Sequence, residues 1–462
     1  MQGTIINEKA LADLKGTIRG DVVTPSDDRY GEARRVYNAM IDKRPAVVVR
    51  CSDVADVIFA VNTARKEGLN VAIRGGGHSV PGFGTADGAL VIDLGKMKGI
   101  RIDPATRTVR AEGGCTWGDL NHATYPFKMA VPGGIISTTG IAGLTLGGGT
   151  GYLTRSAGLT IDNLLSADVI LADGTFVTAS EKENSDLFWA LRGGGGNFGV
   201  VTNFEYRLHP VSDIVGGPMF FEVKDAPAVL HAFNDYMDKA PRQLGAFFGW
   251  HIAPPLPFIP KDRHGDAFCA IVVCWTGPAD QAKAAIAPLR QAAPVVADGV
   301  GQMPFPVLNA VFDPLLPPGL QHYWKGVFAK DIIDGAIEAH MRFGPKVPAV
   351  NTAVHIYPIN GAAHDVAPDA TAFGHRDSKY VVVIAGVWPD VMQNEANIQW
   401  VRDYYKALAP HSEEGGYINF ASSDDANRVA ANFGRNYGRL RKVKTEYDPD
   451  NFFRINQNIA PA

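Results

Sequence analysis

The stretch Val71-Ala-Ile-Arg-Gly-Gly-Gly-His-Ser-Val80 joins a short apolar segment to three glycines and one histidine. Glycine has no Cβ, so this run can expose successive backbone N–H groups, adopt positive φ and let a large ligand lie against the main chain. His78 would then be the reactive side chain next to that ligand. The alternative is a tight turn that carries a surface histidine, and the remainder of the sequence has to distinguish the two.

Length and composition describe an ordinary globular protein. The chain has 462 residues, enough for two or three domains, with 46% apolar and 20% charged residues. Its formal net charge is −4 and no cluster of lysine and arginine stands out, which argues against a nucleic-acid partner. The 4 cysteines show no Cys-x-x-Cys spacing, so neither a metal site nor a disulfide framework is expected.

The segment from Met1 to Gly16 is charged, with Glu8, Lys9 and Asp13 within it. It contains no apolar run long enough for a signal peptide or a membrane span. We therefore expect a cytoplasmic enzyme with no membrane partner. The oligomeric state does not follow from the sequence.

The 50 glycines are concentrated in a few segments. Eight of the nineteen residues from Gly133 to Gly151 are glycine, and Gly193 to Gly196 form a further run. Because Ile, Leu and Tyr are interleaved with the first cluster, backbone packed against a ligand fits better than a flexible linker. The chain contains no P-loop string, and the dinucleotide fingerprint is broken after Gly75-x-Gly77 and after Gly147-x-Gly149. A bound dinucleotide would therefore need a different cradle.

Capping and periodicity predict the elements around the opening stretch. A strand over 46–49 precedes a helix that begins after Ser52, its N-cap, and ends at Gly68. The strand that starts at Val71 then closes a β-α-β unit. Further strands are expected over 89–94, 100–102 and 108–111, a short helix near 117–125, and a hairpin over 168–180 around Asp173-Gly174.

The character of the sequence changes near Val211, where the glycine clusters stop and prolines gather. Patterns typical of strands occur over 246–251, 270–275, 353–357 and 380–385, and helical patterns over 279–292 and 391–408. These patterns predict a second domain of mixed α+β structure.

Several motifs have the order and spacing found in berberine-bridge-enzyme-like FAD-linked oxidases, which the chain resembles over nearly its whole length. This family lies within the vanillyl-alcohol-oxidase, or PCMH-type, flavoprotein superfamily. The motifs are Arg74-Gly-Gly-Gly-His-Ser79, Pro132-Gly-Gly134, Gly140-x-x-Gly143, Leu146-Gly-Gly-Gly-x-Gly151, Gly158-Leu-x-x-Asp-Asn163, Asp186-Leu-Phe-Trp-Ala-x-Arg-Gly-Gly-Gly-Gly-Asn-Phe-Gly-Val-Val201, Tyr323-Trp-Lys325, Asn436-Tyr-x-Arg-Leu-x-x-Val-Lys444, Asp448-Pro-x-Asn-x-Phe453 and Gln457.

The resemblance implies an α+β fold with a PCMH-type FAD-binding domain of two subdomains over residues 1–210, completed by residues 415–462. Residues 211–414 would form an α+β substrate-binding domain with an antiparallel sheet flanked by helices. FAD would lie between the two subdomains, with His78 bonded covalently to a methyl carbon of the flavin. The cofactor-binding residues implied are His78, Arg74, Gly75, Gly76, Gly77, Ser79, Pro132, Gly133, Gly134, Thr138, Gly140, Gly143, Gly148, Gly149, Val201, Asn456 and Gln457.

The sequence departs from the family in the number of flavin links. Many relatives have a second link from a cysteine in a Gly-x-Cys-x-x-x-Gly setting, and Ile136 stands at that position here. Isoleucine cannot form the bond, so a single covalent histidyl link is expected. Cys115 in Gly113-Gly-Cys-Thr-Trp117 is a less favoured link, because a small buried thiol explains it equally well.

The catalytic groups are less clearly indicated than the cofactor site. Many relatives carry a tyrosine base at the fourth place of a Tyr-x-Asn-Tyr string, and Phe420 has lost that hydroxyl here. The candidates for a base or an orienting group are Tyr357, Tyr417 and His355, with Tyr323 and Lys325 as further possibilities. In relatives, the residue at the position of Thr139 borders the side of the flavin that faces oxygen, so Thr139 is expected to support the reaction with oxygen. The alternative is that Thr139 only packs and bonds to the backbone. We expect the substrate cavity to be lined by Trp250, Tyr323 and Trp324.

The resemblance and these residues predict a flavoprotein oxidase. A small organic substrate, such as an alcohol or a phenolic, polyketide-like or alkaloid-like molecule, would give a hydride to FAD, and O2 would reoxidise the flavin to yield H2O2. The alternatives are a flavin-dependent oxygenase that tailors secondary metabolites, a flavin dehydrogenase, and a flavin-carrying binding protein without turnover.

Overall fold

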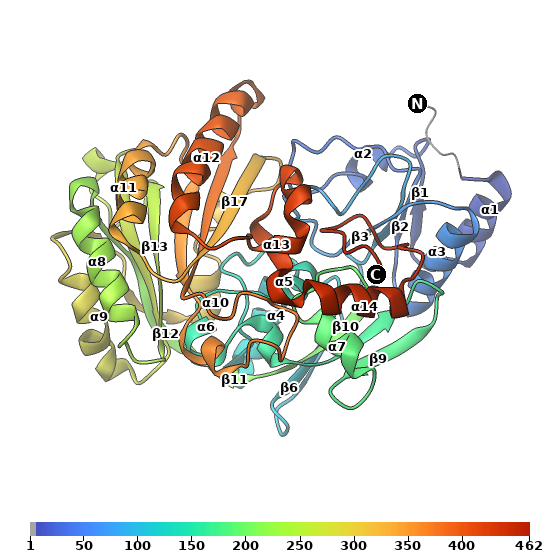
Figure 1. Ribbon diagram of the computed structural model, residues 1–462, viewed down its shortest axis with the longest axis horizontal. Helices are drawn as coiled ribbons and strands as arrows, with labels where there is room; N and C mark the ends of the chain where they lie inside the picture. The colour runs from blue at the N-terminus through green and yellow to red at the C-terminus, as the bar shows by residue number, and fades with distance from the viewer. Residues whose placement is uncertain (1–5) are drawn as a thin grey trace.

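The computed structural model describes residues 6–462 and has an α+β architecture built on several sheets (Figure 1). The first sheet has the strand order β1 (Asp21–Val23), β2 (Val47–Arg50), β4 (Leu90–Asp93) and β3 (Val71–Arg74). Helix α3 (Val54–Lys66) connects β2 to β3, which confirms the expected β-α-β unit. β4 lies between these two strands and is parallel to both. Helices α1 (Glu8–Thr17) and α2 (Tyr30–Ala33) complete this part of the chain.

One detail of helix α3 differs from the expectation. Asp53, rather than Ser52, is the N-cap, and its carboxylate accepts a hydrogen bond from the backbone N–H of Asp56. An aspartate and a serine are both strong N-caps, so the sequence alone did not choose between neighbours.

The second sheet has the order β5 (Ile100–Asp103), β6 (Thr108–Glu112), β10 (Val200–Arg207), β8 (Leu164–Ile170) and β9 (Phe176–Ser180). The hairpin of β8 and β9 is confirmed, and Gly174 takes φ +84° in its turn. A two-stranded ribbon pairs β7 (Met129–Ala130) with β11 (His209–Pro210). The helices of this region are α4 (Trp117–Thr124), α5 (Ile141–Gly147), α6 (Thr154–Ala157) and α7 (Ser185–Leu191).

A large antiparallel sheet occupies the other side of the molecule (Figure 1). Its order is β15 (Val295–Asp298), β12 (Asp213–Glu222), β14 (Ala267–Trp275), β13 (Leu244–Ile252), β18 (Ala353–Pro358), β19 (Tyr380–Trp388) and β17 (Gln321–Ala329), and β16 (Gly301–Pro304) also pairs with β12. Four helices cover one face of this sheet: α8 (Ala226–Met237), α9 (Ala282–Arg290), α11 (Asp334–Phe343) and α12 (Asn394–Leu408). The short helix α10 (Phe305–Asn309) follows β16.

Side chains alternate between the two faces of the large sheet, as the period of a β-strand requires. Trp250, Val354 and Ile384 belong to the core between the sheet and its helices. Their strand neighbours Phe247 and Tyr357 point to the opposite face, where they pack against the glycine-rich first half of the chain. One face of the large sheet therefore forms a hydrophobic core with the helices, and the other face packs against the first half of the chain, where a site can form between them.

The C-terminal segment returns to the first half of the chain through α13 (Val429–Phe433) and α14 (Tyr437–Tyr447) (Figure 1). The ammonium of Lys444, which is completely buried, donates to Asp448 Oδ2 at 2.5 Å and to the carbonyls of Asn197 and Phe453. These bonds fix the tail beside the glycine run that precedes β10. Within residues 6–462, no helix combines the length and apolar character that crossing a membrane requires.

Candidate active site

A cavity of about 340 Å³ lies between the glycine-rich half of the chain and the open face of the large sheet. Its first wall, the glycine wall, consists of the loop after β3, the segment 134–147 with helix α5, and residues 195–201. Its second wall, the sheet wall, consists of alternate residues of β17, β18 and β19. The C-terminal segments 418–420 and 453–457 close the remaining sides.

The loop after β3 is anchored by Arg74, the last residue of that strand. The guanidinium of Arg74 is buried and donates to Asp93 Oδ2 at 2.8 Å, to the carbonyl of Ala33 at 2.7 Å and to the carbonyl of Arg35 at 3.0 Å. Gly76 lies so close to Gly140 that an added Cβ would be 2.4 Å from the Gly140 nitrogen. The loop and the start of α5 therefore contact each other backbone to backbone.

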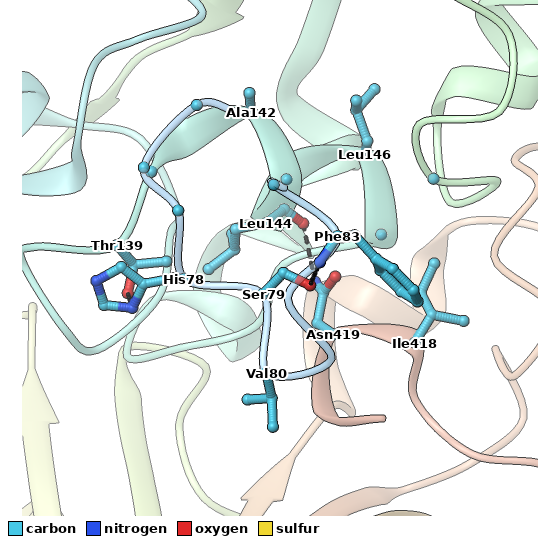
Figure 2. Close-up of a pocket in the computed structure, with 18 of the residues that line it drawn as sticks. His78, Ser79, Val80, Phe83, Thr139, Ala142, Leu144, Leu146, Ile418 and Asn419 are labelled. Carbon is cyan, nitrogen blue, oxygen red and sulfur yellow. Dashed lines mark hydrogen bonds between the residues drawn. The ribbon is translucent and has the colours of Figure 1, made fainter. Parts of the chain in front are cut away.

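His78 lies in the cavity with both ring nitrogens close to threonine hydroxyls. Its Nε2 is 3.2 Å from Thr138 Oγ1. Its Nδ1 is 3.3 Å from the Oγ1 of Thr139, which lies beside it in Figure 2. The imidazole stacks on Tyr37, with ring centroids 3.7 Å apart and an interplanar angle of 17°. Desolvation lowers the pKa of His78 to about 4, so the ring is neutral at pH 7.

The glycine wall leaves space and unpaired polar groups for a large ligand. An added Cβ on Gly143 or Gly196 would meet no atom within 4 Å, although both residues line the cavity. The buried Asn456 Oδ1 and Gln457 Oε1 also line it, and neither has a hydrogen-bond partner in the described structure. These two oxygens are hydrogen-bond acceptors and are satisfied when a ligand with O–H or N–H donors binds, so the cavity fits the sugar hydroxyls and ring N–H groups of a dinucleotide.

Most of the expected cofactor residues meet at this wall. The expected cofactor residues that line the cavity are Arg74, Gly75, Gly76, Gly77, His78, Ser79, Gly134, Gly140, Gly143, Val201, Asn456 and Gln457, and Thr139, expected to face oxygen, lines it as well. Figure 2 shows how Ser79 Oγ turns back to accept from the N–H of Phe83, and how Asn419 donates to the carbonyl of Leu144. The first bond holds the loop after β3 to itself, and the second joins the C-terminal segment to helix α5.

Five expected cofactor residues are not part of the cavity lining: Pro132, Gly133, Thr138, Gly148 and Gly149. The physical reason is that several of them support the cradle from behind. An added Cβ on Gly133 would lie 2.4 Å from the Trp117 ring, and one on Gly149 would lie 2.1 Å from Thr160 Oγ1. Thr138 contacts the cavity only through its hydrogen bond to His78.

The sheet wall is almost entirely apolar and uncharged. It presents Ala353, His355 and Tyr357 from β18, Val383, Ala385 and Val387 from β19, and Trp324 from β17, with Phe420 and Leu316 beside them. Among the described residues that line the cavity, Arg74 is the one with a permanent charge, and its partner Asp93 neutralises it.

Tyr357 and His355 form a hydrogen-bonded pair on this wall. The Tyr357 hydroxyl lies 2.6 Å from His355 Nδ1. Burial raises the pKa of Tyr357, and burial together with the nearby His251 lowers the pKa of His355. Both groups are therefore neutral at pH 7, and the phenol can donate its proton to the imidazole.

Two residues expected in the substrate cavity lie on the opposite face of the sheet. Trp250 is fully buried against the helices, and Tyr323 donates a hydrogen bond to Asp424 Oδ2 at 2.6 Å on the same side. Lys325 also faces away from the cavity and binds Asp424 and Asp425 at 2.7 Å. The reason is the period of two along a strand: Trp324 faces the cavity, so its neighbours cannot.

Tyr417 is also absent from the cavity lining. Its hydroxyl accepts hydrogen bonds from the N–H of Gly149 at 2.5 Å and from Asn419 Nδ2 at 2.9 Å, so it anchors the C-terminal segment behind the glycine wall. Phe420 does line the cavity. Ile136 lines it as well, whereas Cys115 is buried elsewhere, close to the carbonyl of Gly99.

Several residues of the site were not identified from the sequence. Tyr37 stacks on His78 from a segment with no motif, and Asn351 and Leu316 line the cavity from loops. His251 meets His355 across neighbouring strands, with 3.1 Å between the two Nε2 atoms. His251 could have been predicted from the alternation of side chains along the strand. Consecutive residues lie on opposite faces, so His251 faces the cavity side if Trp250 faces the helices.

Comparison with known proteins identifies the family. The family model described as FAD binding domain matches residues 45–180, and the model described as berberine and berberine like matches residues 416–460. An uncharacterized FAD-linked oxidoreductase of Bacillus subtilis is 32% identical over 457 residues, which cover 97% of this chain and 98% of the relative.

Two comparisons concern enzymes of nicotine oxidation. (R)-6-hydroxynicotine oxidase of Paenarthrobacter nicotinovorans is 31% identical over 468 residues, covering 96% of this chain and 97% of that enzyme. The crystal structure of 6-hydroxy-D-nicotine oxidase from Arthrobacter nicotinovorans matches with a TM-score of 0.85 and 29% identity, covering 96% of this chain and 98% of that one. The chain therefore belongs to the berberine-bridge-enzyme-like family of FAD-linked oxidases and is an FAD-dependent oxidase.

Proposed function

We propose that this oxidase acts on small uncharged alcohols or phenols, with FAD bound covalently through His78 and with Tyr357 accepting the substrate proton. The observation that carries the proposal is that His78 and Tyr357 line one cavity from its two different walls. Residues 1–210 and 415–462 would bind FAD, and residues 211–414 would supply the substrate wall.

A single covalent link through His78 is supported by the chemistry of its surroundings. The ring is neutral at pH 7, as a nucleophile must be, and threonine hydroxyls can either donate to or accept from its nitrogens. Ile136 lines the cavity where many relatives carry a second linking residue, and Cys115 lies outside the cavity. The burial that raises the pKa of Cys115 to about 12 also makes it a poor nucleophile.

FAD held by the glycine wall would supply an acceptor for a hydride from the substrate carbon, with O2 as the final oxidant and H2O2 as the second product. Loss of hydride from an alcohol carbon requires a base for the hydroxyl proton. When Tyr357 donates its own proton to His355 Nδ1, the phenolic oxygen retains lone pairs that can accept a hydrogen bond from the substrate. His355 is then the group that keeps the phenol correctly oriented.

The preference for an uncharged substrate follows from the cavity lining. Among the described residues, the cavity has no carboxylate or ammonium free to pair with a charged substrate. An ion would lose its hydration without compensation in such an apolar site. Aromatic and aliphatic side chains such as Trp324, Phe420 and Val383 instead favour a ring.

Anaerobic flavin bleaching tests this function. The screen offers matched compounds: 4-hydroxybenzyl alcohol, its carboxylated analogue 4-(hydroxymethyl)benzoate, a benzylic amine and a free sugar. We expect the neutral alcohol or a related phenol to bleach the flavin fastest and to give one H2O2 per turnover in air. Faster bleaching by the carboxylate, the ammonium or the sugar would contradict the proposed substrate class.

Thr139 is proposed to border the place where O2 reacts with reduced flavin. It lines the cavity, and its hydroxyl is fixed 3.3 Å from His78 Nδ1. Stopped-flow reoxidation of the photoreduced enzyme should be slower in Thr139→Val and close to wild type in Thr139→Ser. Equal reoxidation rates in all three proteins would remove the hydroxyl from this role.

We also propose that the enzyme works in the reducing cytoplasm. All four cysteines are free and buried. Free thiols persist in that compartment, whereas secreted proteins more often contain disulfides. Fractionation of the producing cells, with the flavin absorbance as marker, tests the location.

A further inference from the structure

His251 extends the Tyr357–His355 pair into a chain of three groups. The Tyr357 hydroxyl is 2.6 Å from His355 Nδ1, and His355 Nε2 is 3.1 Å from His251 Nε2. All three side chains are about 6% exposed. Tyr357 and His355 line the substrate cavity, while His251 lies behind them, one residue before the end of β13.

Gly249 makes this chain possible. It lies directly opposite His355 in the pairing of β13 with β18, and His251 is the next residue on the same face of β13. An added Cβ on Gly249 would lie 2.6 Å from His251 Nε2 and 3.0 Å from His355 Cδ2. A side chain at this position would therefore occupy the space in which the two imidazoles meet.

The contact between the neutral imidazoles of His355 and His251 restricts which ring nitrogen of each histidine carries the hydrogen. A neutral histidine has one N–H donor and one acceptor nitrogen. If Tyr357 donates to His355 Nδ1, then His355 Nε2 carries the hydrogen and donates to His251 Nε2, so His251 must be protonated on Nδ1. Donation in the opposite direction, from His251 to His355 and from His355 to Tyr357, satisfies the same two hydrogen bonds. In each hydrogen bond, the two arrangements differ in which of the two atoms carries the proton.

We propose that His251 is the terminal proton acceptor of a relay that runs from the substrate through Tyr357 and His355. This inference rests on the proposed role of Tyr357 and adds His251 to it. The substrate O–H bond breaks and its proton binds the Tyr357 oxygen, while the phenolic proton moves to His355 Nδ1 and the His355 Nε2 proton moves to His251 Nε2. The hydride goes to FAD, and His251, then an imidazolium, loses its Nδ1 proton to solvent.

The surroundings of His251 keep it neutral before each turnover and return it to the neutral form once it has been protonated. Desolvation lowers the pKa of His251 to about 4. It is packed against Phe312 and His355, and Phe268 is its partner on β14. Two carboxylates adjoin residues packed around His251, and both are bound elsewhere: Asp313, next to Phe312, accepts from the N–H of Ser137, and Asp266, before Ala267 on β14, pairs with Arg263. Tyr152, which faces Tyr357, stays protonated because burial raises its pKa.

The relay makes a prediction that a purely structural role does not. His251→Gln can still accept the hydrogen bond from His355, but an amide cannot take the proton. We therefore expect His251→Gln and His251→Phe to reduce the rate of anaerobic flavin bleaching by at least about tenfold. Covalent flavin content and the rate of reoxidation by O2 should stay at wild-type values. A wild-type bleaching rate in His251→Gln would overturn the relay.

Two further experiments separate the relay from the proposed function. Tyr357→Phe is measured with the same probe, 4-hydroxybenzyl alcohol or the faster neutral compound of the screen. If Tyr357→Phe is slow and the His251 variants are fast, only the relay is wrong; if Tyr357→Phe is fast, the proposed base and the relay both fail. Gly249→Ala, which keeps all three groups and separates the rings, should behave like His251→Phe.

Imidazole nitrogen NMR of the resting holoenzyme tests the chain without any substrate. We expect one imidazole N–H signal, protected from exchange, that disappears in His251→Phe and shifts in Tyr357→Phe. A spectrum in which Tyr357→Phe leaves that signal unmoved would show that the three groups are not connected.

Discussion

The glycine wall and the sheet wall face each other across one cavity but are built on different principles. The glycine wall consists of backbone, and its shape depends on missing side chains at Gly76, Gly140 and Gly143. The sheet wall consists of side chains, and its content depends on which alternate residues of β17, β18 and β19 face inward. The glycine wall suits a cofactor that all members of a family bind. In the sheet wall, single substitutions can alter which substrate is bound without disturbing the cofactor site.

The largest expected effect comes from filling the glycine wall. In Gly76→Ala the new Cβ would lie 2.4 Å from the backbone nitrogen of Gly140, where no flexible group can move away. We expect the protein to lose its flavin and to be destabilised by at least about 1–3 kcal/mol, the usual cost of overpacking. Thermal unfolding and flavin absorbance of the purified protein measure both effects.

Gly143→Ala is the matched control for that substitution. Its Cβ would meet no protein atom within 4 Å, and alanine is favoured over glycine within helix α5. The apoprotein should therefore be as stable as wild type or slightly more so, while FAD content falls because the methyl group enters the cofactor space. Full FAD content in Gly143→Ala would mean that the cofactor does not contact this wall.

Tyr357→Phe tests the sheet wall. Removal of the proton acceptor should slow anaerobic flavin bleaching roughly 100- to 10,000-fold, the range typical of general bases. The flavin spectrum should not change, because Tyr357 is not part of the glycine wall. Tyr323→Phe is the control: it removes the same atom from the opposite face of the sheet and should leave the bleaching rate unchanged.

Trp250 and Trp324 separate the two faces of the sheet. Trp250→Ala opens a hole in the core under the helices and should reduce the free energy of unfolding by about 3–5 kcal/mol, with kcat/KM of the folded enzyme preserved. Trp324→Ala should have the opposite profile, with a raised KM and a smaller loss of stability, because Trp324 lines the cavity. Urea unfolding and steady-state kinetics of both variants test this prediction. A raised KM in Trp250→Ala, or the larger loss of stability in Trp324→Ala, would contradict it.

The last expected effect leaves activity at neutral pH unchanged and is a pH dependence of stability that arises from the buried sheet wall. Burial lowers the pKa of His251 to about 4, so between pH 6.5 and 4 the unfolded chain binds more protons than the folded one. The contribution of His251 to the free energy of unfolding should therefore be complete above pH 6.5 and fall by up to about 3 kcal/mol toward pH 4. His251→Phe should reduce the slope of stability against pH, to which His78 and His355 also contribute, and an identical slope in that variant would contradict the neutral, buried state of His251.

The sequence predicted the glycine wall better than the sheet wall, and the reason is physical. Arg74, Gly75 to Gly77 and His78 follow one another in the chain, so their spatial relation is local. The hairpin at Gly174 and helix α3 were likewise predictable from local turn and capping chemistry.

The sheet wall depends on contacts between distant residues. His251 and His355 meet only because β13 pairs with β18 in one register, and a shift by one residue would bring Trp250 to the cavity instead. Tyr323 and Trp250 were assigned to the cavity because they are aromatic. Which face of the sheet each side chain occupies depends on how the strands pair, and the sequence alone does not give that pairing. Tyr37 reaches His78 from a segment with no periodic pattern at all.

We propose that His78 alone joins this chain to FAD by a covalent bond. The most direct measurement is the absorbance of the purified enzyme after acid denaturation and removal of free flavin. Wild type should remain yellow, with the flavin on the peptide that contains His78, and Cys115→Ala should remain equally yellow. His78→Ala should release all its colour. Flavin that washes out of the denatured wild-type protein, or a yellow His78→Ala pellet, would contradict the account.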